Sequence, residues 1–359
     1  MKLSRTKSIL AINPGATSTK YGIFAGDEAV WQETVRHPYH ELSGFARVTD
    51  QLDLRINLIT GAIAKAGFRL EDLDAVVGRG GLLKPLAGGT YRVNEAMLRD
   101  LRLGVQGEHA SNLGGIMAYC LAERLGIPAF VVDPVAVDEM DDIARLSGLP
   151  DLPRKSLSHA LNMKAVARRV AKEMGSSYFD VNLVVAHLGS GISVSPHRKG
   201  RMIDVNNALN EGPFSPERTG GLPALELVKL CYSGKYTLDQ MIALVSREGG
   251  MYAYLGTKDL KEAEERAAGG DRQAVLVLEA MAYQVAKEIG AMAAVLAGEV
   301  DRVVLTGGMA YSQSLVDKIV ARVKFIAPVA VVPGEEELPS LAQGALRVLN
   351  GEEEAKIYV

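Results

Sequence analysis

The hydrophobic pattern of this chain contains one arrangement twice. Residues 9–24 run from an apolar segment of strand length, through a turn at Asn13-Pro14-Gly15, into a second apolar segment. Residues 181–195 repeat the order of strand, turn and strand, with Gly189-Ser190-Gly191 in the turn. Because the two predicted hairpins lie about half a chain apart, we interpret them as parts of a duplicated unit whose hairpins face one cleft.

The polar residues of the first turn suit a phosphate group. The turn holds Gly15, hydroxyl side chains at 17–19, and Lys20. Backbone N–H groups, hydroxyls and a cation at a strand turn are typical ligands of phosphate oxygens. The turn is not a P-loop, since the G-x-x-x-x-G-K spacing is missing and no helix pattern follows. From this stretch alone, an ordinary polar hairpin turn is an equally good interpretation.

The remaining pattern alternates predicted strands with predicted helices. Strand-length apolar runs cover 29–35, 73–77, 129–132, 301–306 and 327–332. Helical periodicity covers 43–66, 94–102, 107–125, 158–174, 225–232, 238–247, 260–268, 271–297 and 339–349. This alternation predicts an α/β fold in which helices cover a sheet. The polar, Pro-rich segment 141–154 is the predicted crossover, so we expect one domain over 1–150 plus 338–359 and another over 151–337.

Two arginines lie in glycine-rich surroundings. Arg79 sits among the glycines of segment 78–81, and Arg218 lies in the Gly- and Pro-rich loop 210–223. Beside glycine the backbone can approach a ligand closely, and a guanidinium can then reach it. For Arg79, a plain arginine in a turn is the alternative.

Other candidates lie near the ends of predicted elements. Asp133 follows a buried strand, where ligands bind in open α/β sheets, and Gly307-Gly308-Met309 follows another strand in a turn suited to a nucleoside. Phosphoryl transfer needs cations, a magnesium ion held by carboxylates, and in-line positioning, and the chain offers all of these residue types. Each histidine taken alone is more simply structural. The further candidates are His109, His159, His187 and Glu336 or Glu337.

Composition narrows the class of protein. Of 359 residues, 48% are apolar and 23% charged, as in ordinary globular enzymes, and a net charge of −3 gives no electrostatic case for binding nucleic acid or an anionic membrane. Cys120 and Cys231 fall in helical patterns and are expected to be reduced core thiols. The segment 37–40, with His37 and His40, resembles a metal pair, but its proline favours an exposed loop. The basic start and the short apolar run after it predict neither a signal peptide nor a membrane span, so we expect a cytoplasmic protein.

Taken together in order, the motifs resemble the acetate kinase family, which belongs to the actin/sugar-kinase/Hsp70 fold. The residues that carry this likeness are Asn13-Pro14-Gly15 through Lys20-Tyr21-Gly22, Arg79-Gly80-Gly81, Ala186 to Gly191, Gly212 to Gly220 and Leu305 to Gly308. They span nearly the whole chain. The resemblance implies two duplicated ribonuclease-H-like domains around a central nucleotide cleft. It also implies a homodimer or a higher homo-oligomer.

The resemblance implies a reaction and the residues that perform it. The reaction is reversible phosphoryl transfer from ATP to the carboxylate of butyrate, giving ADP and butyryl phosphate. The implied catalytic residues are Asn13, Arg79, His159 and Arg218, with the two arginines as a transition-state pair. The implied phosphate-binding residues are Ser18, Lys20, His187, Gly189, Ser190 and Gly191.

Magnesium and adenosine sites follow from the same resemblance. The metal-linked positions are Asp133 and Glu336, with Glu337 as the alternative to Glu336. The adenosine positions are Asp259, Leu260, Gly307, Gly308 and Met309. The chain departs from acetate kinases at Ala16, where they carry serine, and at Lys261, where they carry an arginine that stacks on adenine. Nucleotide preference is therefore open.

The expected acyl pocket involves Arg79, Gly80, Gly81, His109 and Ser158. Acetate kinases place valines at the two glycines and phenylalanine at Ser158, so smaller side chains here predict room for a longer acid. Each buried CH₂ contributes about 0.8 kcal/mol. We therefore expect butyrate to be preferred strongly over acetate and modestly over propionate, with the ranking against isobutyrate left open. We also expect valine at Gly81 to favour shorter acids.

Two other functions compete with this one. A sugar kinase of the same fold must deprotonate a hydroxyl and would recruit a carboxylate such as Asp133 as base. A fatty-acid carboxylate is already ionised at neutral pH and needs no base. An actin-like ATP-binding scaffold would hold nucleotide without transferring phosphate, but two arginines directed at the ligand argue against it.

Overall fold

The computed structural model describes residues 6–359, and this part of the chain divides into two compact units. The first unit comprises the chain up to Val137 together with Glu336–Val359, and the second is Asp138–Glu335. Residues 138–150, which the sequence assigned to the first domain, belong to the second unit. Residues 1–5 of the basic start lie outside the described residues.

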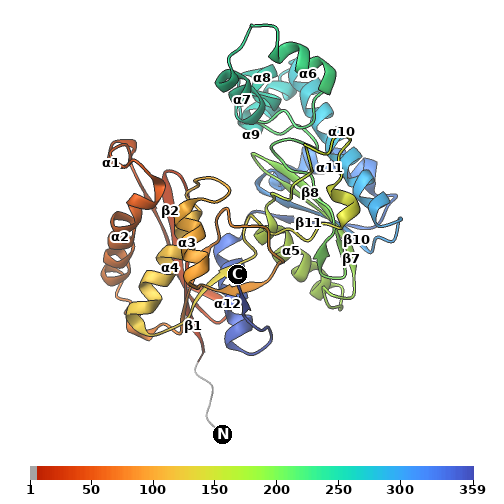
Figure 1. Cartoon of the computed structure of the whole chain (residues 1–359). Helices are drawn as coiled ribbons and strands as arrows, with labels where there is room; N and C mark the ends of the chain where they lie inside the picture. The colour runs from red at the N-terminus through yellow and green to blue at the C-terminus, as the bar shows by residue number, and fades with distance from the viewer. Residues whose placement is uncertain (1–5) are drawn as a thin grey trace. The chain divides into compact units, whose positions relative to one another are not determined.

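The first unit, in which Figure 1 labels β1 and β2, is built on a mixed sheet with strand order β12-β5-β6-β4-β1-β2-β3. Strands β1, β2 and β3 form an antiparallel meander, and β1, β4 and β6 run parallel. The strands are β1 (Ser8–Pro14), β2 (Ser18–Ala25), β3 (Glu28–Arg36), β4 (Ala75–Arg79), β5 (Thr90–Arg92), β6 (Ala129–Val132) and β12 (Lys356–Ile357).

Helices cover both faces of the central strands in this unit. Nearly every residue of β1, β4 and β6 is buried, as expected for parallel strands sandwiched between helices. Helices α2 and α4 lie on one side of the sheet and α12 on the other (Figure 1). The helices are α1 (Tyr39–Leu42), α2 (Leu52–Lys65), α3 (Glu95–Leu103), α4 (Asn112–Leu125) and α12 (Glu337–Leu349), with 3₁₀ turns at Val48–Gln51 and Leu70–Asp72.

The second unit repeats the topology of the first. Its sheet has the order β11-β10-β7-β8-β9, so an antiparallel meander is again followed by parallel strands on the side of its first strand. This agreement confirms the duplication predicted from the two hairpins. The strands are β7 (Asn182–Leu188), β8 (Ile192–Arg198), β9 (Arg201–Met202), β10 (Arg302–Gly307) and β11 (Val329–Pro333).

Long helices complete the core of the second unit. Helix α10 packs against β7, β8 and α11, and α5 packs against β7 and β10. The helices are α5 (Ala160–Glu173), α6 (Ala224–Cys231), α7 (Leu238–Ser246), α8 (Gly250–Leu255), α9 (Leu260–Ala268), α10 (Arg272–Val295) and α11 (Gln313–Val323), with 3₁₀ turns at Asp142–Arg145 and Gly308–Tyr311.

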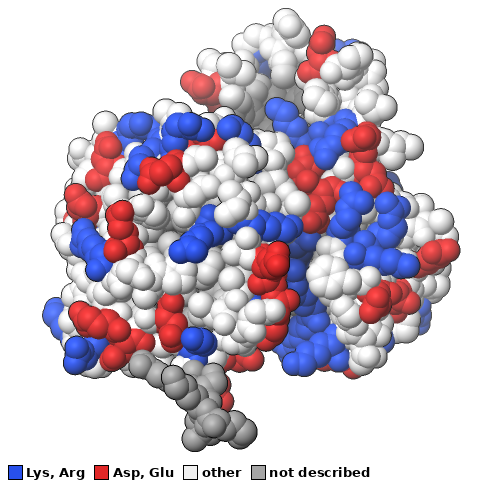
Figure 2. All heavy atoms as spheres, turned by 60° about the horizontal axis from the view of Figure 1, so that its bottom comes forward, with Lys and Arg blue, Asp and Glu red and all other residues white. Residues whose placement is uncertain are grey.

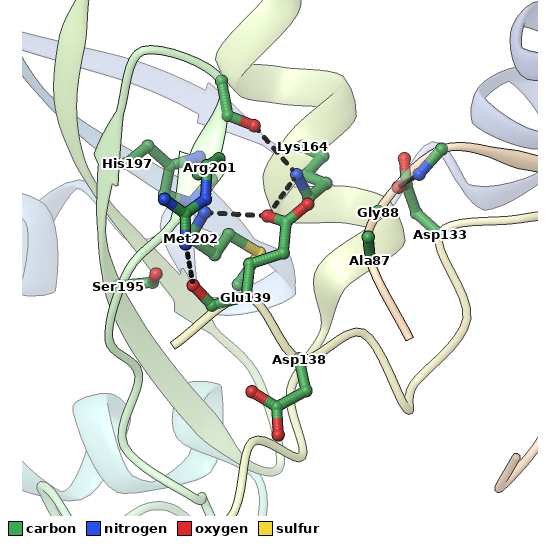
Figure 3. A network of polar contacts seen from close by, with 12 residues as sticks. Ala87, Gly88, Asp133, Asp138, Glu139, Lys164, Ser195, His197, Arg201 and Met202 are labelled. Atoms are coloured by element: carbon green, nitrogen blue, oxygen red, sulfur yellow. Dashed lines mark hydrogen bonds and ion pairs between the residues drawn. The ribbon is translucent and has the colours of Figure 1, made fainter. Parts of the chain in front are cut away.

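Carboxylates attach the start of the second unit to its sheet. The Glu139 carboxylate lies 2.8 Å from Nζ of Lys164, which is 2% exposed, and accepts the N–H of Met202 at 2.9 Å (Figure 3). Asp141 pairs with Arg198 at 2.7 Å. These contacts explain why the domain boundary precedes the Pro-rich segment, although composition placed it within that segment.

Three expectations from the sequence are wrong. His37 is buried at 2% exposure, where its Nε2 lies 2.8 Å from Thr19 Oγ1, so segment 37–40 is not simply an exposed loop. Neither free cysteine is a core thiol: Cys231 is exposed, because α6 buries none of its residues, and Cys120 on α4 is only half-buried. The helix expected from 43 begins only at Leu52, after a 3₁₀ turn.

Basic and acidic side chains are interspersed on the face drawn in Figure 2. Within residues 6–359, none of the helices is long and apolar enough to cross a membrane.

Candidate active site

In the first unit, polar side chains meet where parallel strands end. Asn13 near the end of β1 and Arg79 at the end of β4 come from neighbouring strands, in a register that pairs Ile12 with Gly78. Glu337, the first residue of α12, lies between them. Its carboxylate is 2.6 Å from Arg79 Nη1 and accepts a short hydrogen bond from the Asn13 amide. The expected phosphoryl-binding residues Asn13 and Arg79 are therefore held together by a carboxylate.

Arg79 keeps donor capacity for a ligand. Its Nε is buried, and among the described residues it has no hydrogen-bond partner. A buried donor without a partner costs free energy. Such atoms in a folded protein often mark the place of a bound group.

Asp133 lies at the end of β6 in an unusual backbone conformation. Its φ is +37°, a region that few non-glycine residues adopt. The residue is buried, and its carboxylate accepts the N–H of Gly89 at 2.6 Å. Strained residues of this kind occur where neighbouring structure holds a side chain in place for function.

The carboxylates of this unit suit magnesium, which needs few protein ligands, better than a metal whose ligands all come from the protein. Among residues 6–359, no group of three or more metal-ligating side chains occurs. Magnesium needs only one or two carboxylates, because water and substrate phosphates complete its shell. The buried Asp133 is one candidate for such a carboxylate. Glu336 is exposed at the N-cap of α12, whereas Glu337 is joined to Asn13 and Arg79.

His109 lies just before α4 in the first unit. Its Nδ1 accepts the Ser111 N–H at 3.2 Å and lies 2.8 Å from Ser111 Oγ, which assigns the proton of the neutral ring to Nε2. The residue is exposed as a whole. Even so, burial of the ring and the charge of Arg79 lower its pKa, so the ring is neutral at pH 7.

The structure contradicts the expected role of Gly80 and Gly81 in opening an acyl pocket. A Cβ on Gly80 would overlap Pro134 and Val131, and a Cβ on Gly81 would overlap Asn112. The space beside both glycines is therefore filled by the protein itself. Glycine is needed here for close packing, so a valine at Gly81 would disturb the fold before it could narrow a pocket.

The second hairpin carries stacked histidines. His187, near the end of β7, stacks on His159 with ring centroids 3.9 Å apart and an interplanar angle of 11°. Asn162 Oδ1 lies 2.7 Å from His187 Nδ1, while its amide nitrogen donates to Gly334 O, so Nδ1 of His187 is the donor. His187 Nε2 is buried and lies 3.2 Å from the Glu335 carboxylate without hydrogen-bond geometry. His159 Nδ1 lies 3.1 Å from Ser193 Oγ on β8.

Arg218 lies against the turn of the same hairpin. Its guanidinium occupies the place where a Cβ on Gly191 would be, so only glycine permits this approach. Ser215 attaches the Arg218 loop to the turn, since its hydroxyl donates to Ser190 O at 2.5 Å and accepts the Arg218 N–H at 3.2 Å. Burial lowers the pKa of Arg218, and Glu217 opposes that shift. Its buried Nε has no partner among the described residues.

The other residues expected in the second unit have mixed surroundings. Ser158 is buried, and its Oγ lacks a partner among residues 6–359. Asp259 caps α9 by accepting the Lys261 N–H at 2.8 Å, and Leu260 packs against the core. Gly307 exchanges backbone hydrogen bonds with Gly334. Nothing lies within 4 Å of a Cβ on Gly308, which leaves open space there.

The sequence did not reveal several residues that support the site. Asn162 orients His187 and Ser193 orients His159. The Arg55 guanidinium donates a hydrogen bond to the first hairpin turn. Arg55 shares a face of α2 with Ile59 and Ile63, at i, i+4 and i+8. A charged residue on an apolar helix face was the signal that could have identified it. A mainly apolar cavity of about 730 Å³, lined in part by Phe214, Leu222, Tyr254 and Leu276, was also unexpected.

Comparisons with known proteins agree on one family. Residues 153–337 match the model of the acetokinase family. The chain is 54% identical over 351 residues to butyrate kinase 2 of Clostridium acetobutylicum, covering 98% of this chain and 99% of that protein. It is 52% identical, with the same coverage, to butyrate kinase 1 of that organism.

A solved structure shows the same fold at lower identity. The crystal structure of Porphyromonas gingivalis acetate kinase superimposes with a TM-score of 0.79 at 20% identity, covering 96% of this chain and all of that one. The duplicated α/β architecture is thus that of the acetate kinases, as expected from the sequence. This chain belongs to the acetokinase family.

Proposed function

We propose that this protein is a butyrate kinase, which transfers the γ-phosphoryl group of ATP to the carboxylate of butyrate and catalyses the reverse reaction. The observation that carries the proposal is the 54% identity to butyrate kinase 2 over essentially the full length of both chains. The positions of Arg79 and Arg218 support it, because each presents a buried guanidinium nitrogen that has no partner among the described residues.

The arginines supply what the reaction needs most. Butyrate is ionised at neutral pH, so attack on phosphorus requires relief of repulsion between two anions and no general base. We propose that Arg79 and Arg218 both act on the transferring phosphoryl group, whose charge spreads over its equatorial oxygens in the transition state. Glu337 holds Arg79 in place, and Gly191 allows Arg218 to lie against the turn of the second hairpin.

Hydrogen bonds complete the positioning of this group. Asn13 and His159 are proposed to donate to its oxygens. The contact of His159 Nδ1 with Ser193 Oγ at 3.1 Å orients the ring for this role. Ser18 and Lys20 of the first turn bind phosphate, as does the second turn at 189–191. We assign His109 to binding of the fatty acid, to which its neutral ring would donate a hydrogen bond through Nε2.

Magnesium and nucleotide binding follow the same proposal. Asp133 and a glutamate at the start of α12 would hold the metal, Glu337 being favoured over Glu336 by its contact with Arg79 and Asn13. When bound, magnesium neutralises phosphate charge. Asp259, Leu260, Gly307, Gly308 and Met309 are proposed to bind adenosine, and the open space at Gly308 fits an approaching ligand.

We also propose a homo-oligomer. Helix α6 exposes Leu225, Val228 and Leu230, at 67%, 53% and 37%. Adjacent exposed apolar side chains on a helix are typical of interaction surfaces. Light scattering at micromolar concentration should give a dimer or larger, and a monomer would contradict this part. We place the enzyme in the cytoplasm.

The test is ATP consumption measured in a coupled assay against acetate, propionate, butyrate, isobutyrate and valerate. We expect kcat/KM to be highest for a four-carbon acid. Acetate equal to or better than butyrate would make the protein a short-chain acid kinase of the same family. Sugar-dependent turnover would favour a sugar kinase with Asp133 as base, and ATP binding without any turnover would favour a scaffold.

A further inference from the structure

Arg55 is a buried cation that the proposed reaction does not use directly. Its side chain rises from α2 and is fully buried beneath the turn between β1 and β2. The guanidinium donates to Gly15 O at 2.9 Å, to Ala16 O at 3.2 Å and to Ser18 O at 3.3 Å. It also donates to Thr19 Oγ1 at 3.0 Å and to Gln51 Oε1 at 2.8 and 3.1 Å.

The remaining carbonyl of the turn is bound as well. Thr17 O accepts the N–H of His37 at 2.8 Å, and Ser18 O also accepts the N–H of Gly15 at 2.7 Å. Every backbone carbonyl from 15 to 18 is therefore directed at a donor within the protein. The carbonyls of Gly15, Ala16 and Ser18 point toward Arg55. Because carbonyl and N–H point in opposite directions in a trans peptide, the N–H groups of the residues that follow them, 16, 17 and 19, are turned away from Arg55. Backbone N–H groups arranged in this way form a concavity that binds anions.

The charge of Arg55 is not balanced by a carboxylate. Its hydrogen-bond acceptors are carbonyls, a hydroxyl and an amide, and no ion pair to it occurs among residues 6–359. Burial lowers the pKa of its guanidinium to about 10, so it stays charged at neutral pH. An isolated buried charge is costly unless something compensates it. An anion bound at the turn above would do so.

We propose that Arg55 is a positioning residue for phosphate, which holds the first turn in its anion-binding shape and supplies positive charge behind it. The proposal rests on the phosphate-binding role given above to the first hairpin. The guanidinium touches no substrate. It acts through the peptides of residues 15–18, and it would matter only for ligands that carry phosphate.

The test compares ATP with adenosine in calorimetric titrations that contain magnesium. Arg55→Met removes the charge and its donors, and Arg55→Lys keeps the charge but not the planar fork. Arg69→Met is the matched control, because Arg69 is an exposed arginine of the same unit, 3.7 Å from Glu71. We expect ATP to bind about tenfold more weakly to Arg55→Met, with a smaller loss in Arg55→Lys. Adenosine should bind all variants equally, and Arg69→Met should match the wild type.

Several outcomes would overturn the proposal. Equal weakening of ATP and adenosine would mean that Arg55 is only a structural support, and unchanged ATP binding would mean that it is not needed. An equal loss of ATP affinity in Arg69→Met would mean that removing any positive charge from this unit weakens binding, wherever the charge lies. If Arg55→Met does not fold, the comparison of Arg55→Lys with wild type decides in the same way.

Failure of the proposed function is distinguishable from failure of this inference. Wild-type protein without butyrate-dependent turnover, but with ATP binding that depends on Arg55, would refute the function and support the inference. Butyrate-dependent turnover with ATP binding insensitive to Arg55 would do the reverse. Wild-type protein that does not bind ATP would refute both.

Discussion

The two hairpins have the same topology but different support. The turn of the first unit lies on a buried cation, Arg55, which binds the carbonyls of Gly15, Ala16 and Ser18. In the second unit, no cation binds the carbonyls of the turn in the described contacts, and Arg218 lies against Gly191. Instead, side chains approach it closely through Gly189 and Gly191.

The difference shows how a duplicated fold can serve two roles. Shared topology places each turn at the carboxyl edge of its sheet, where ligands bind. The first turn has a fixed backbone and positive charge behind it, which suits holding a phosphate. The second brings His187, His159 and Arg218 together around one turn, which suits stabilising charge as it develops.

The largest expected effect comes from removing either arginine. Arg218→Ala and Arg79→Ala should each lower kcat about a hundredfold or more while changing the KM for ATP much less, since one preorganised charge donor is lost. Steady-state kinetics with butyrate and ATP measure both parameters. If either variant kept near wild-type turnover, that arginine would not be a catalytic residue. Arg69→Ala serves as the control.

Glycine-to-alanine substitutions should affect kcat differently in the two turns. Gly191→Ala would displace the Arg218 guanidinium, and we expect kcat to fall about tenfold, because small misplacements of catalytic groups are costly. Gly15→Ala is the matched change in the first turn, where the nearest contact of its Cβ would be Ser18 O at 3.4 Å. It should have little effect. Similar losses in both variants would mean that Arg218 does not depend on the close approach.

Chain-length preference should depend on the second unit and not on Gly81. Gly81→Val should destabilise the protein by about 1–3 kcal/mol through overlap with Asn112, without a specific shift toward shorter acids. Ser158→Phe should shift preference toward acetate by severalfold, as one methylene is worth about 1–3 kcal/mol in a pocket. Thermal unfolding and kcat/KM across the acids test both. A clear shift toward acetate in a stable Gly81→Val protein would restore the original interpretation.

The smallest expected effect is a pH dependence of stability at the first hairpin. Burial, followed by the charge of Arg55, lowers the pKa of His37 below its ordinary 6.5. The unfolded chain therefore binds the proton more tightly, and the free energy of unfolding should fall as pH drops below 6.5. His37→Gln should reduce the loss of Tm between pH 7.5 and 5.5. Part of this loss of Tm should remain in the variant, because the pKa values of His109 and His197 are also lowered. An unchanged difference in Tm would exclude His37 as a contributor.

The sequence by itself determined the repeated hairpins, the alternation of strands and helices, and the positions of Arg79 and Arg218 in glycine-rich segments. These features are local, because strand and helix periods and turn residues are read within a few positions of each other. The same local patterns also identified the family, which the comparisons confirmed.

Only the tertiary structure decided which neighbours fill the space around these residues. Glycine at 81 reads as open space in the sequence, yet Asn112 occupies that space. Glu337 and Arg79, which are far apart in the sequence, form an ion pair, and Arg55 donates hydrogen bonds to a turn from which β2, β3 and α1 separate it along the chain. The periodicity of α6 predicts an apolar side of the helix, but it does not show whether other segments cover that side. Packing of this kind depends on contacts between distant segments, and the pattern of a single segment holds no record of them.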